Sequence, residues 1–502
     1  MRERNMRELL SRSICQWCYG KDCHDIFTCS VKFGDTEIWH TEMARVQSTV
    51  NDDVEIVILG ECVDVREGHD AYKITEGLSC LDGEAFEKEI ENLCGGYVIF
   101  RRDKDDVKVY GDAIHMMSVY YGINKYAGIV SSCEALIVDD ITKTSSTSAK
   151  VLSGAYDSGL YLAGDMTMYD DVKALLPNHY LSLSEGRSVR YFPREELKLA
   201  KTEAEVDEIV DNTIKMVERC IRQFEKRMLF ASPLTPGGDS RLNCAFLNRI
   251  MPQNNVLYYV IDTKEMKSFQ ENRILVKKLA NEFKFKDFHF YPEVEALSSD
   301  IVEDFKRTLG PIREWRNRIW SFHPDIKNRT LVSGDLIGHV LGGQIGKLMP
   351  EWLVGAWFLK VLQRNVSRIA GKEVVRWCDD IKDAIGKGYS KFDMWYWEIR
   401  CGRWNANTVS RDDLVGIQVI NFYNAHRIIN DWCRIPRRLR VRKLIHRRLL
   451  NRLYPSVANI EFNPCACQGG RVSSPFWAKV IPVWCRTTVA HIIQMIKRCD
   501  CI

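Results

Sequence analysis

The sequence predicts a protein of two domains, the first α+β and rich in antiparallel strands, the second α/β with a parallel sheet. A chain of 502 residues is longer than one hydrophobic core usually organises. Up to about residue 192 short strands alternate with turns, and from about residue 203 strands alternate with helices. We therefore expect domains at 26–195 and 203–460, with extensions at 1–25 and 461–502.

Several strands are expected in the first domain. The segments 26–33 and 54–65 are apolar or alternating, and 96–113 alternates into a turn at 103–106 and back, as a β-hairpin does. Further short strands are expected within 117–133 and 179–192. Residues 1–25 are polar and mixed in charge, so we expect an N-terminal extension that is poorly ordered at its extreme end.

The second domain is expected to begin with a helix. Its apolar residues recur at helical spacing from residue 203, with charged residues between them: Val206, Ile209, Val210, Ile214 and Val217. After it we expect strands at 228–231, 256–262 and 286–292, with helices at 241–250 and 271–283 between them. From about residue 345 the chain reads as mostly helical.

Composition and charge limit the classes of function. Hydrophobic residues make up 45% and charged residues 27%, which is typical of a globular protein, and 71 basic against 67 acidic residues leave a net charge of only +4. The net charge therefore does not by itself favour binding to nucleic acid. No run approaches the roughly 20 apolar residues of a membrane span, and the start lacks the apolar core of a secretory signal. We expect a cytoplasmic protein with neither nucleic acid nor membrane as partner; a homodimer is left open.

The 18 cysteines are expected to be reduced thiols, because a chain of this length without a signal segment rarely carries a disulfide framework. A zinc site is the alternative for Cys15, Cys18, Cys23 and Cys29, but these residues contain only one CxxC pair. Two later pairs, Cys465 with Cys467 and Cys499 with Cys501, lack partners at finger-like spacing.

A glycine-rich stretch, ASPLTPGGDSRL at 231–242, lies between an expected buried strand and a helix. A parallel sheet exposes backbone N–H groups at such a place, which favours an anion such as phosphate. Gly237 and Gly238 would allow close approach, Thr235 and Ser240 would donate hydroxyls, and Asp239 would hold a magnesium ion. The alternative is a tight turn with Asp239 or Ser240 capping the helix.

This stretch resembles the SGGxDS pyrophosphate loop of the PP-loop ATP pyrophosphatases, in particular the asparagine synthetase family. Thr235 stands for the first serine, and Gly237, Asp239 and Ser240 match. Other stretches resemble family landmarks in order. They are 94–122 with Asp112, Tyr120 and Tyr121; 170–192 with Asn178 in place of a glycine; SGDLIGH at 333–339, which is similar to the second phosphate-side loop SGxGxDE; and two C-terminal segments, 393–404 and 419–455.

The resemblance implies an N-terminal Ntn-hydrolase-like sandwich and a C-terminal PP-loop ATP-binding domain with a helical end. It implies an ATP- and Mg²⁺-dependent ligase that activates a carboxylate as an acyl-adenylate for attack by an amine. Small molecules or peptides would supply both groups. Lys443 occupies the place of the catalytic lysine, with Arg447 one helical turn later. Nine Lys or Arg residues between 434 and 452 also read as a solvated basic face, or less readily as a nucleic-acid groove.

The resemblance also assigns the remaining site residues. Ser333 and Gly334 would bind ATP, Asp335 would be a second metal ligand, and the adenine would lie against Val260 and Ile261. Tyr396 and Glu398 lie where related enzymes place residues that activate the amine. Since tryptophans crowd that stretch, packing is an equal alternative for Tyr396.

Departures from the pattern bear on activity. Pro236 replaces a loop glycine and removes one N–H donor. In the second loop, Gly338 and His339 replace the two acidic residues. Glutamine-using members need a cysteine at the mature N-terminus, whereas this chain begins with Met1 and Arg2, and neither Cys15 nor Cys18 has the family's Cys-Gly-Ile context. We expect the glutaminase chemistry to be lost, as in β-lactam synthetases and lasso-peptide cyclases. A degenerate nucleotide-binding protein, or retained use of glutamine after processing, are the alternatives.

Overall fold

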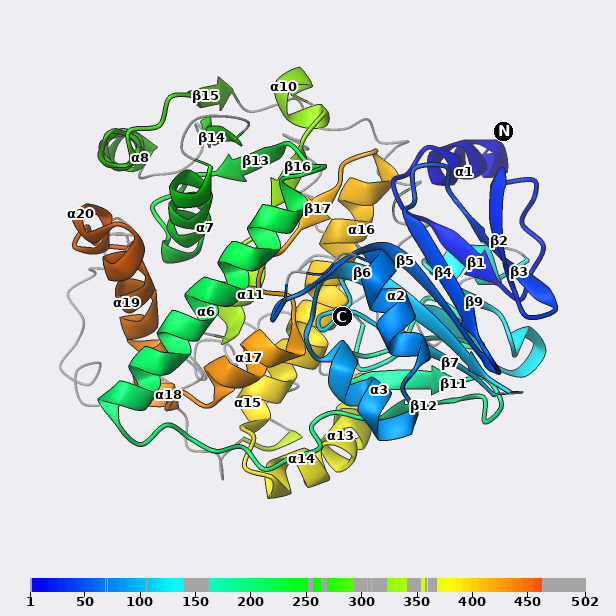
Figure 1. Cartoon of the computed structure of the whole chain (residues 1–502). Coiled ribbons are helices and arrows are strands. Elements are labelled where there is room, and N and C mark those ends of the chain that lie inside the picture. Colours follow the sequence, from blue (N-terminus) through cyan, green and yellow to red (C-terminus); the bar gives the residue numbers. More distant parts are fainter. Residues whose placement is uncertain are drawn as a thin grey trace.

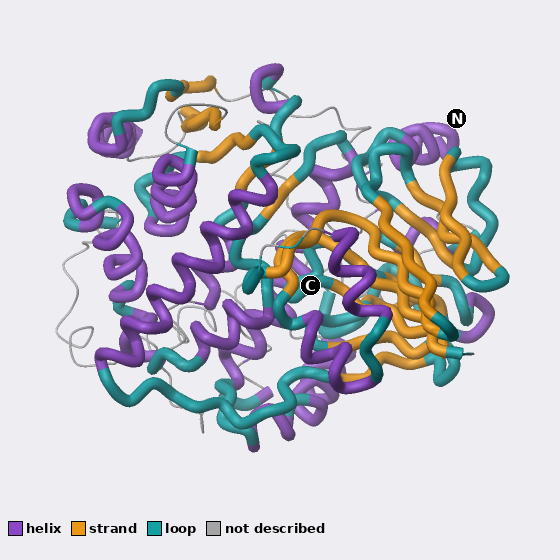
Figure 2. Tube along the Cα trace, viewed as in Figure 1, coloured by secondary structure: helices purple, strands orange, loops and turns teal. Residues whose placement is uncertain are grey.

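The computed structural model describes residues 2–139, 162–251, 256–262, 269–292, 323–340 and 368–462, apart from 68, 70 and 105, together with 305, 308, 354–356 and 359. Two domains lie side by side (Figure 1). Antiparallel strands gather in the first domain, and helices dominate the second (Figure 2). The predicted layout of antiparallel sheets followed by a parallel α/β unit is confirmed.

The described part of the first domain contains two antiparallel sheets of six strands each. The first sheet has the order β10 (Val172–Ala174), β8 (Tyr120–Gly122), β9 (Val130–Ser131), β1 (Trp17–Tyr19), β3 (Thr36–His40) and β2 (Cys29–Phe33). The second has the order β12 (Arg187–Arg190), β11 (His179–Ser182), β7 (Asp106–Gly111), β6 (Leu93–Asp103), β5 (Val54–Asp64) and β4 (Val46–Asn51). The predicted hairpin is β6–β7, in which Asp103 pairs with Asp106.

Alternation along β5 builds both faces of the second sheet. Val57 and Leu59 face the first sheet and pack with residues such as Trp17 and Phe33 between the two sheets. Ile56 and Ile58 face the opposite way, toward helices α2 (Ala71–Ser79) and α3 (Gly83–Ile90). The sequence reasoning missed these two helices. Among the described residues of this domain, the remaining short helices are α4 (Glu134–Ile137) and a 3₁₀ turn at Asn124–Tyr126.

The structure corrects the expectation that residues 1–25 stand apart from the first domain. They contain helix α1 (Arg2–Ser11) and strand β1, which lies between β9 and β3 inside the first sheet. Leu10 and Trp17 are fully buried. The reason is tertiary, because Leu10 packs with Phe27 and with Leu414 of the second domain.

The second domain is built on a parallel sheet with the order β15 (Phe288–Pro292), β14 (Val256–Asp262), β13 (Phe230–Pro233), β16 (Thr330–Val332) and β17 (Val419–Ile420). Helix α6 (Glu203–Phe224) begins as predicted, with a capping box between Thr202 and Glu205. Helix α7 (Gly238–Ile250) packs on β13 and β14, and α6 and α19 (Leu444–Leu453) pack on α7.

The other elements that the structure describes in the second domain are helical. They are α8 (Phe269–Phe283), α10 (Pro324–Lys327), α11 (Asp335–Val340), α13 (Arg368–Asp380), α14 (Lys382–Gly386), α15 (Lys391–Met394), a π-helical segment at Trp395–Asn405, α16 (Ala406–Leu414), α17 (His426–Cys433), α18 (Arg437–Val441) and α20 (Pro455–Ala458).

The two domains share a buried polar interface. Asn424 of the second domain donates to the Gly95 carbonyl and, at 2.7 Å, to Asp112 of the first. The indole of Trp397 donates to the Ala113 carbonyl at 2.6 Å. Burial raises the pKa of Asp112 to about 6, although Asn424 and three backbone N–H groups oppose that shift.

Candidate functional site

The glycine-rich loop joins the carboxyl end of β13 to the first turn of α7. Gly238 begins α7 and Asp239 lies in its first turn, so backbone N–H groups and the positive end of the helix dipole are presented here. The hydroxyls of Thr235 and Ser240 lie 2.7 Å apart, and the Gly237 N–H donates to Thr235 at 3.2 Å. The hydroxyls therefore hold the loop in shape.

Pro236 and Arg241 anchor the other side of the loop. The Arg241 guanidinium is fully buried and donates to the carbonyls of Pro236, Ile460 and Glu461 at 2.7–2.9 Å. Burial lowers its pKa to about 10. A buried cation held by carbonyl groups makes this region electropositive. The sequence reasoning missed Arg241, which lies directly after the matched motif.

Asp239 is the meeting point of three segments that are distant in sequence. Its Oδ1 lies 2.7 Å from Nε2 of His446 in α19. A Cβ added to Gly338 would lie 2.5 Å from its Oδ2, and one added to Gly334 would lie 3.3 Å from its Cβ. The loop at 235–240, the loop at 333–338 and the segment around residue 443 therefore converge on one carboxylate.

Gly338 leaves room for the Asp239 carboxylate in its present position, since a Cβ at residue 338 would make that carboxylate shift. The departure from the resembled pattern is thus coupled to the position that Asp239 adopts. The side chain of His339 lies outside the described residues, as do residues 341–343, so their expected places stay predictions.

Lys443 and Arg447 lie around a phenylalanine near the loop. Lys443 is the N-cap residue of α19 and has a left-handed backbone (φ 54°), and the Arg447 N–H donates to its carbonyl at 3.2 Å, so Arg447 follows one helical turn later. The Lys443 ammonium lies 5.6 Å from the ring centroid of Phe462, the Arg447 guanidinium 5.7 Å, and that of Arg241 4.8 Å. Phe462 also lies against Gly238. Three cations thus surround a ring at the start of α7.

The described residues around Asp239 offer few ligands for a magnesium ion. In the part of the chain that the structure describes, no three His, Cys, Asp or Glu side chains are grouped to hold a metal. One or two carboxylates together with phosphate oxygens suffice for Mg²⁺, and Asp239 is one-third exposed. Asp335 begins α11, one helical turn before Gly338. The alternative of a zinc site at Cys15, Cys18, Cys23 and Cys29 has no such grouping among the described residues either, and no described cysteine is part of a disulfide. The cysteines after residue 462 lie outside the described residues.

Glu398 lies at the interface between the two domains, where its carboxylate accepts several hydrogen bonds. It is fully buried and accepts from Arg190 at 2.6 Å, from Asn178 at 2.8 Å and from the Trp377 indole at 2.8 Å. Tyr396 is buried in the same π-helical segment. These contacts give Glu398 a structural role; a role in activating an amine stays a prediction.

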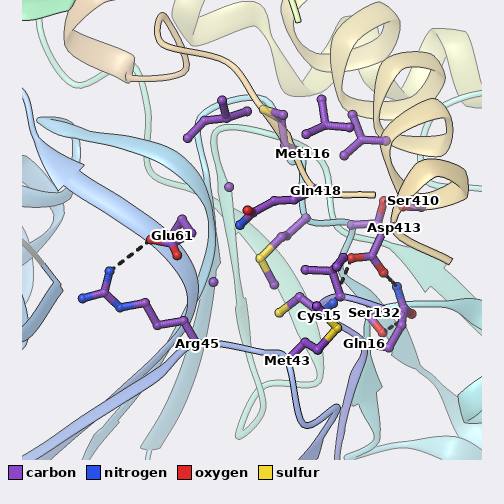
Figure 3. Close-up of a pocket in the computed structure, with 18 of the residues that line it drawn as sticks. Cys15, Gln16, Met43, Arg45, Glu61, Met116, Ser132, Ser410, Asp413 and Gln418 are labelled. Carbon is purple, nitrogen blue, oxygen red and sulfur yellow. Dashed lines mark hydrogen bonds and ion pairs between the residues drawn. The ribbon is translucent and has the colours of Figure 1, made fainter. Parts of the chain in front are cut away.

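A small cavity lies between the domains (Figure 3). Its volume is about 80 Å³, and Cys15, Met43, Met116 and Asp413 line it. The Cys15 N–H, part of a continuous backbone, donates to Asp413 at 2.8 Å. Burial raises the pKa of the Cys15 thiol well above its usual value. In this structure Cys15 therefore offers neither a free α-amino group as a base nor a thiolate as a nucleophile.

A larger cavity, of about 220 Å³, lies at the carboxyl end of the parallel sheet. Ser333, Gly334 and Asp335 of the second loop line it, together with Tyr259 of β14 and residues of α16. Val260 and Ile261 are not among its described lining residues. Val260 packs against the main core, and Ile261 packs beside Tyr259 in a smaller cluster.

Comparisons with known proteins add little. No protein-family model and no curated protein matches the chain. Among solved structures, the allosteric regulatory enzyme of purine biosynthesis has a TM-score of 0.23 at 11% identity, covering 60% of this chain and 81% of its own. Glutamine phosphoribosylpyrophosphate amidotransferase from B. subtilis has a TM-score of 0.23 at 12% identity, covering 65% and 85%. At such scores we draw no inference from them. No described helix is long and apolar enough to cross a membrane.

Proposed function

We propose that the chain is an ATP-dependent, AMP-forming amide ligase of the asparagine-synthetase type. The observation that carries the proposal is the convergence of three segments on Asp239 at the carboxyl end of β13. The resemblance in sequence assigns each of the three to phosphate chemistry. Asp239 and His446 are 207 residues apart in the sequence, so the fold is what brings the three segments together.

The chemistry needs positive potential where pyrophosphate leaves. Attack of a carboxylate oxygen on the α-phosphorus forms one P–O bond and breaks another, and the negative charge passes to the leaving pyrophosphate. The N–H groups at the start of α7, together with Arg241, Lys443 and Arg447, would stabilise that charge. Asp239, and Asp335 as a second candidate, would hold a magnesium ion, which supplies further charge neutralisation when bound.

The first domain is proposed to be an Ntn-hydrolase-like sandwich without glutaminase activity. Cys15 is embedded in the chain, and cleavage before it would remove α1 with the buried Leu10. The amine would then come from the second substrate.

Pyrophosphate exchange tests the ligase. The full-length protein is incubated with ATP, Mg²⁺, labelled pyrophosphate and a panel of carboxylates, and label entering ATP is counted. We expect exchange with at least one carboxylate and its loss in Asp239→Asn. Asp383→Asn, which changes an exposed carboxylate on α14, is the matched control. Absence of exchange with every carboxylate would reject the ligase.

A nucleotide-binding protein without turnover is the second candidate. Pro236 and Gly338 motivate it, and so does the position of Phe462 against Gly238. Calorimetry that detects ATP binding while exchange stays absent would favour this candidate over the ligase.

A further inference from the structure

The cavity of about 220 Å³ at the end of the parallel sheet carries two buried polar side chains whose hydrogen-bonding capacity is unused. Asn405, 1% exposed, ends the π-helical segment, and neither its carbonyl oxygen nor its amide nitrogen has a hydrogen-bond partner among the described residues. The hydroxyl of Tyr259, also 1% exposed, has none either. Both residues line the cavity.

Such groups are rare in native structures because burying an unpaired amide is costly. Two of them on the wall of one cavity, contributed by β14 and by the segment before α16, indicate a shared partner from outside the chain. A buried amide that served only packing would be replaced by an apolar residue at no cost.

The charges around the cavity narrow the chemistry of that partner. Arg411 and Asp412 also line it, and their side chains pair with each other at 2.7 Å, so their charges offset. Asp335 supplies a further carboxylate, which disfavours an anionic ligand. Burial, reinforced by the charge of Asp412, raises the pKa of Tyr259, so its hydroxyl keeps its proton.

We propose that this cavity is a binding subsite for a neutral, flat group that presents a hydrogen-bond donor next to an acceptor. The amide of Asn405 offers the complementary pair, a carbonyl acceptor beside an NH₂ donor. Two kinds of ligand carry such an edge: an adenine base, which asparagine side chains read in this manner elsewhere, and a primary carboxamide. Assigning the group to the adenine of ATP or to an amide product rests on the proposed function; the subsite itself does not.

Calorimetry on the full-length protein tests the subsite with two pairs of probes. Adenosine is compared with purine riboside, which lacks the amino donor, and L-asparagine is compared with L-aspartate, which lacks the amide. We expect one member of a pair, adenosine or L-asparagine, to bind at least tenfold more tightly than its reference compound. Binding of neither at millimolar concentration, or equal binding within both pairs, overturns the proposal.

Variants separate a ligand contact from a structural one. Asn405→Leu is expected to weaken the bound probe at least tenfold, and Tyr259→Phe severalfold, while the melting temperature stays unchanged or rises because unpaired polar groups are removed. The matched control is Asn248→Leu. The Asn248 amide donates to the Phe283 carbonyl and to Tyr454, so its loss should lower the melting temperature and leave binding intact. Unchanged binding in Asn405→Leu, or a fall in its melting temperature like that of the control, contradicts the proposal.

The two proposals fail separately. Asp239→Asn is expected to abolish pyrophosphate exchange and to retain the binding of adenosine or L-asparagine. Probe binding that depends on Asn405 in a protein without exchange would reject the ligase alone, and exchange in Asn405→Leu with unchanged probe binding would reject the subsite alone.

Discussion

Asp239 and His446 make the contact that joins the start of α7 to α19, with Oδ1 and Nε2 2.7 Å apart. His446 is fully buried, and its Nδ1 has no hydrogen-bond partner among the described residues. We infer that Nε2 carries the proton and donates to the carboxylate. His446 therefore fixes the orientation of Asp239 and acts as a positioning residue.

Replacing His446 should weaken metal use rather than fold stability alone. We expect His446→Phe to raise the Mg²⁺ concentration needed for half-maximal pyrophosphate exchange by about 10-fold or more. His446→Gln keeps an N–H donor at a similar reach and should restore most of the Mg²⁺ response. Equal Mg²⁺ dependence in both variants and the native protein would remove the positioning role.

Gly338 leaves the space that Asp239 occupies. A Cβ there would approach Oδ2 to 2.5 Å, so Gly338→Ala should displace the carboxylate and reduce exchange by about 100-fold, as small misplacements in active sites do. Gly77→Ala is the control, because a Cβ on this helical glycine meets nothing within 4 Å. Normal exchange in Gly338→Ala would show that the position of Asp239 is irrelevant to activity.

The ring of Phe462 lies beside three cations that a bound anion would also contact. Its ring lies 4.8–5.7 Å from Arg241, Lys443 and Arg447. We expect Phe462→Ala to bind inorganic pyrophosphate about 2- to 5-fold more tightly, given roughly 0.5–1 kcal/mol for an exposed cation–π contact. Phe290→Ala removes a ring beside Arg273 and Lys277 and should leave that affinity unchanged. Weaker binding in Phe462→Ala would mean that the ring helps to form the site.

Glu398 is expected to matter for stability. Glu398→Gln would leave the nearly buried Arg190 with only part of its negative partners, since Asp380 remains. We expect a loss of about 2–4 kcal/mol in the free energy of unfolding, as for other broken buried ion pairs, measured by urea denaturation. A variant of unchanged stability that lacks ligase turnover would instead support the catalytic role expected from the sequence.

Glu134 should make stability depend on pH. Burial raises its pKa to about 7, and it accepts from the Met168 N–H at 2.6 Å. Between its unfolded pKa near 4.3 and the folded value, the folded protein holds a proton that the unfolded chain has released. Stability from this group is therefore present at low pH and is lost as the pH rises through that window.

The matched comparison is with Glu134→Gln, which cannot titrate. From pH 4 to pH 8 the native protein should lose about 1–3 kcal/mol of unfolding free energy relative to this variant, as measured by urea denaturation at each pH. Parallel pH profiles would show that Glu134 is not perturbed.

The elements that were predicted correctly have strong local signals. The apolar run along 54–64, the hairpin pattern along 93–111 and the helical spacing of apolar residues after residue 203 are visible in short windows of the sequence. Strand β1 was missed because polar residues and cysteines surround its three residues. Strands β16 and β17 contain only three and two residues, which is too short for a recognisable sequence pattern. Pairing with β13 and with each other defines them, and such tertiary pairing leaves no local pattern.

The residues of the candidate site also differ in whether a local sequence pattern reveals them. Asp239 and its loop carry a motif, whereas His446 stands in a basic run that reads as a solvated face. Its partner is 207 residues away. Asn405 and Tyr259 became notable only because the fold buries them without partners. Long-range placement and unmet hydrogen bonds are properties of packing, which one sequence does not display.

The contacts of Asn424 with Asp112 and Gly95 have a thermodynamic consequence. Separating the domains would expose or strand these buried polar groups, and it would also break the contact of Asp413 with the Cys15 backbone. Neither domain therefore has a complete polar interior when it is alone. The two domains form one cooperative unit, so calorimetric melting should be a single transition, and either domain expressed separately should aggregate or fail to fold.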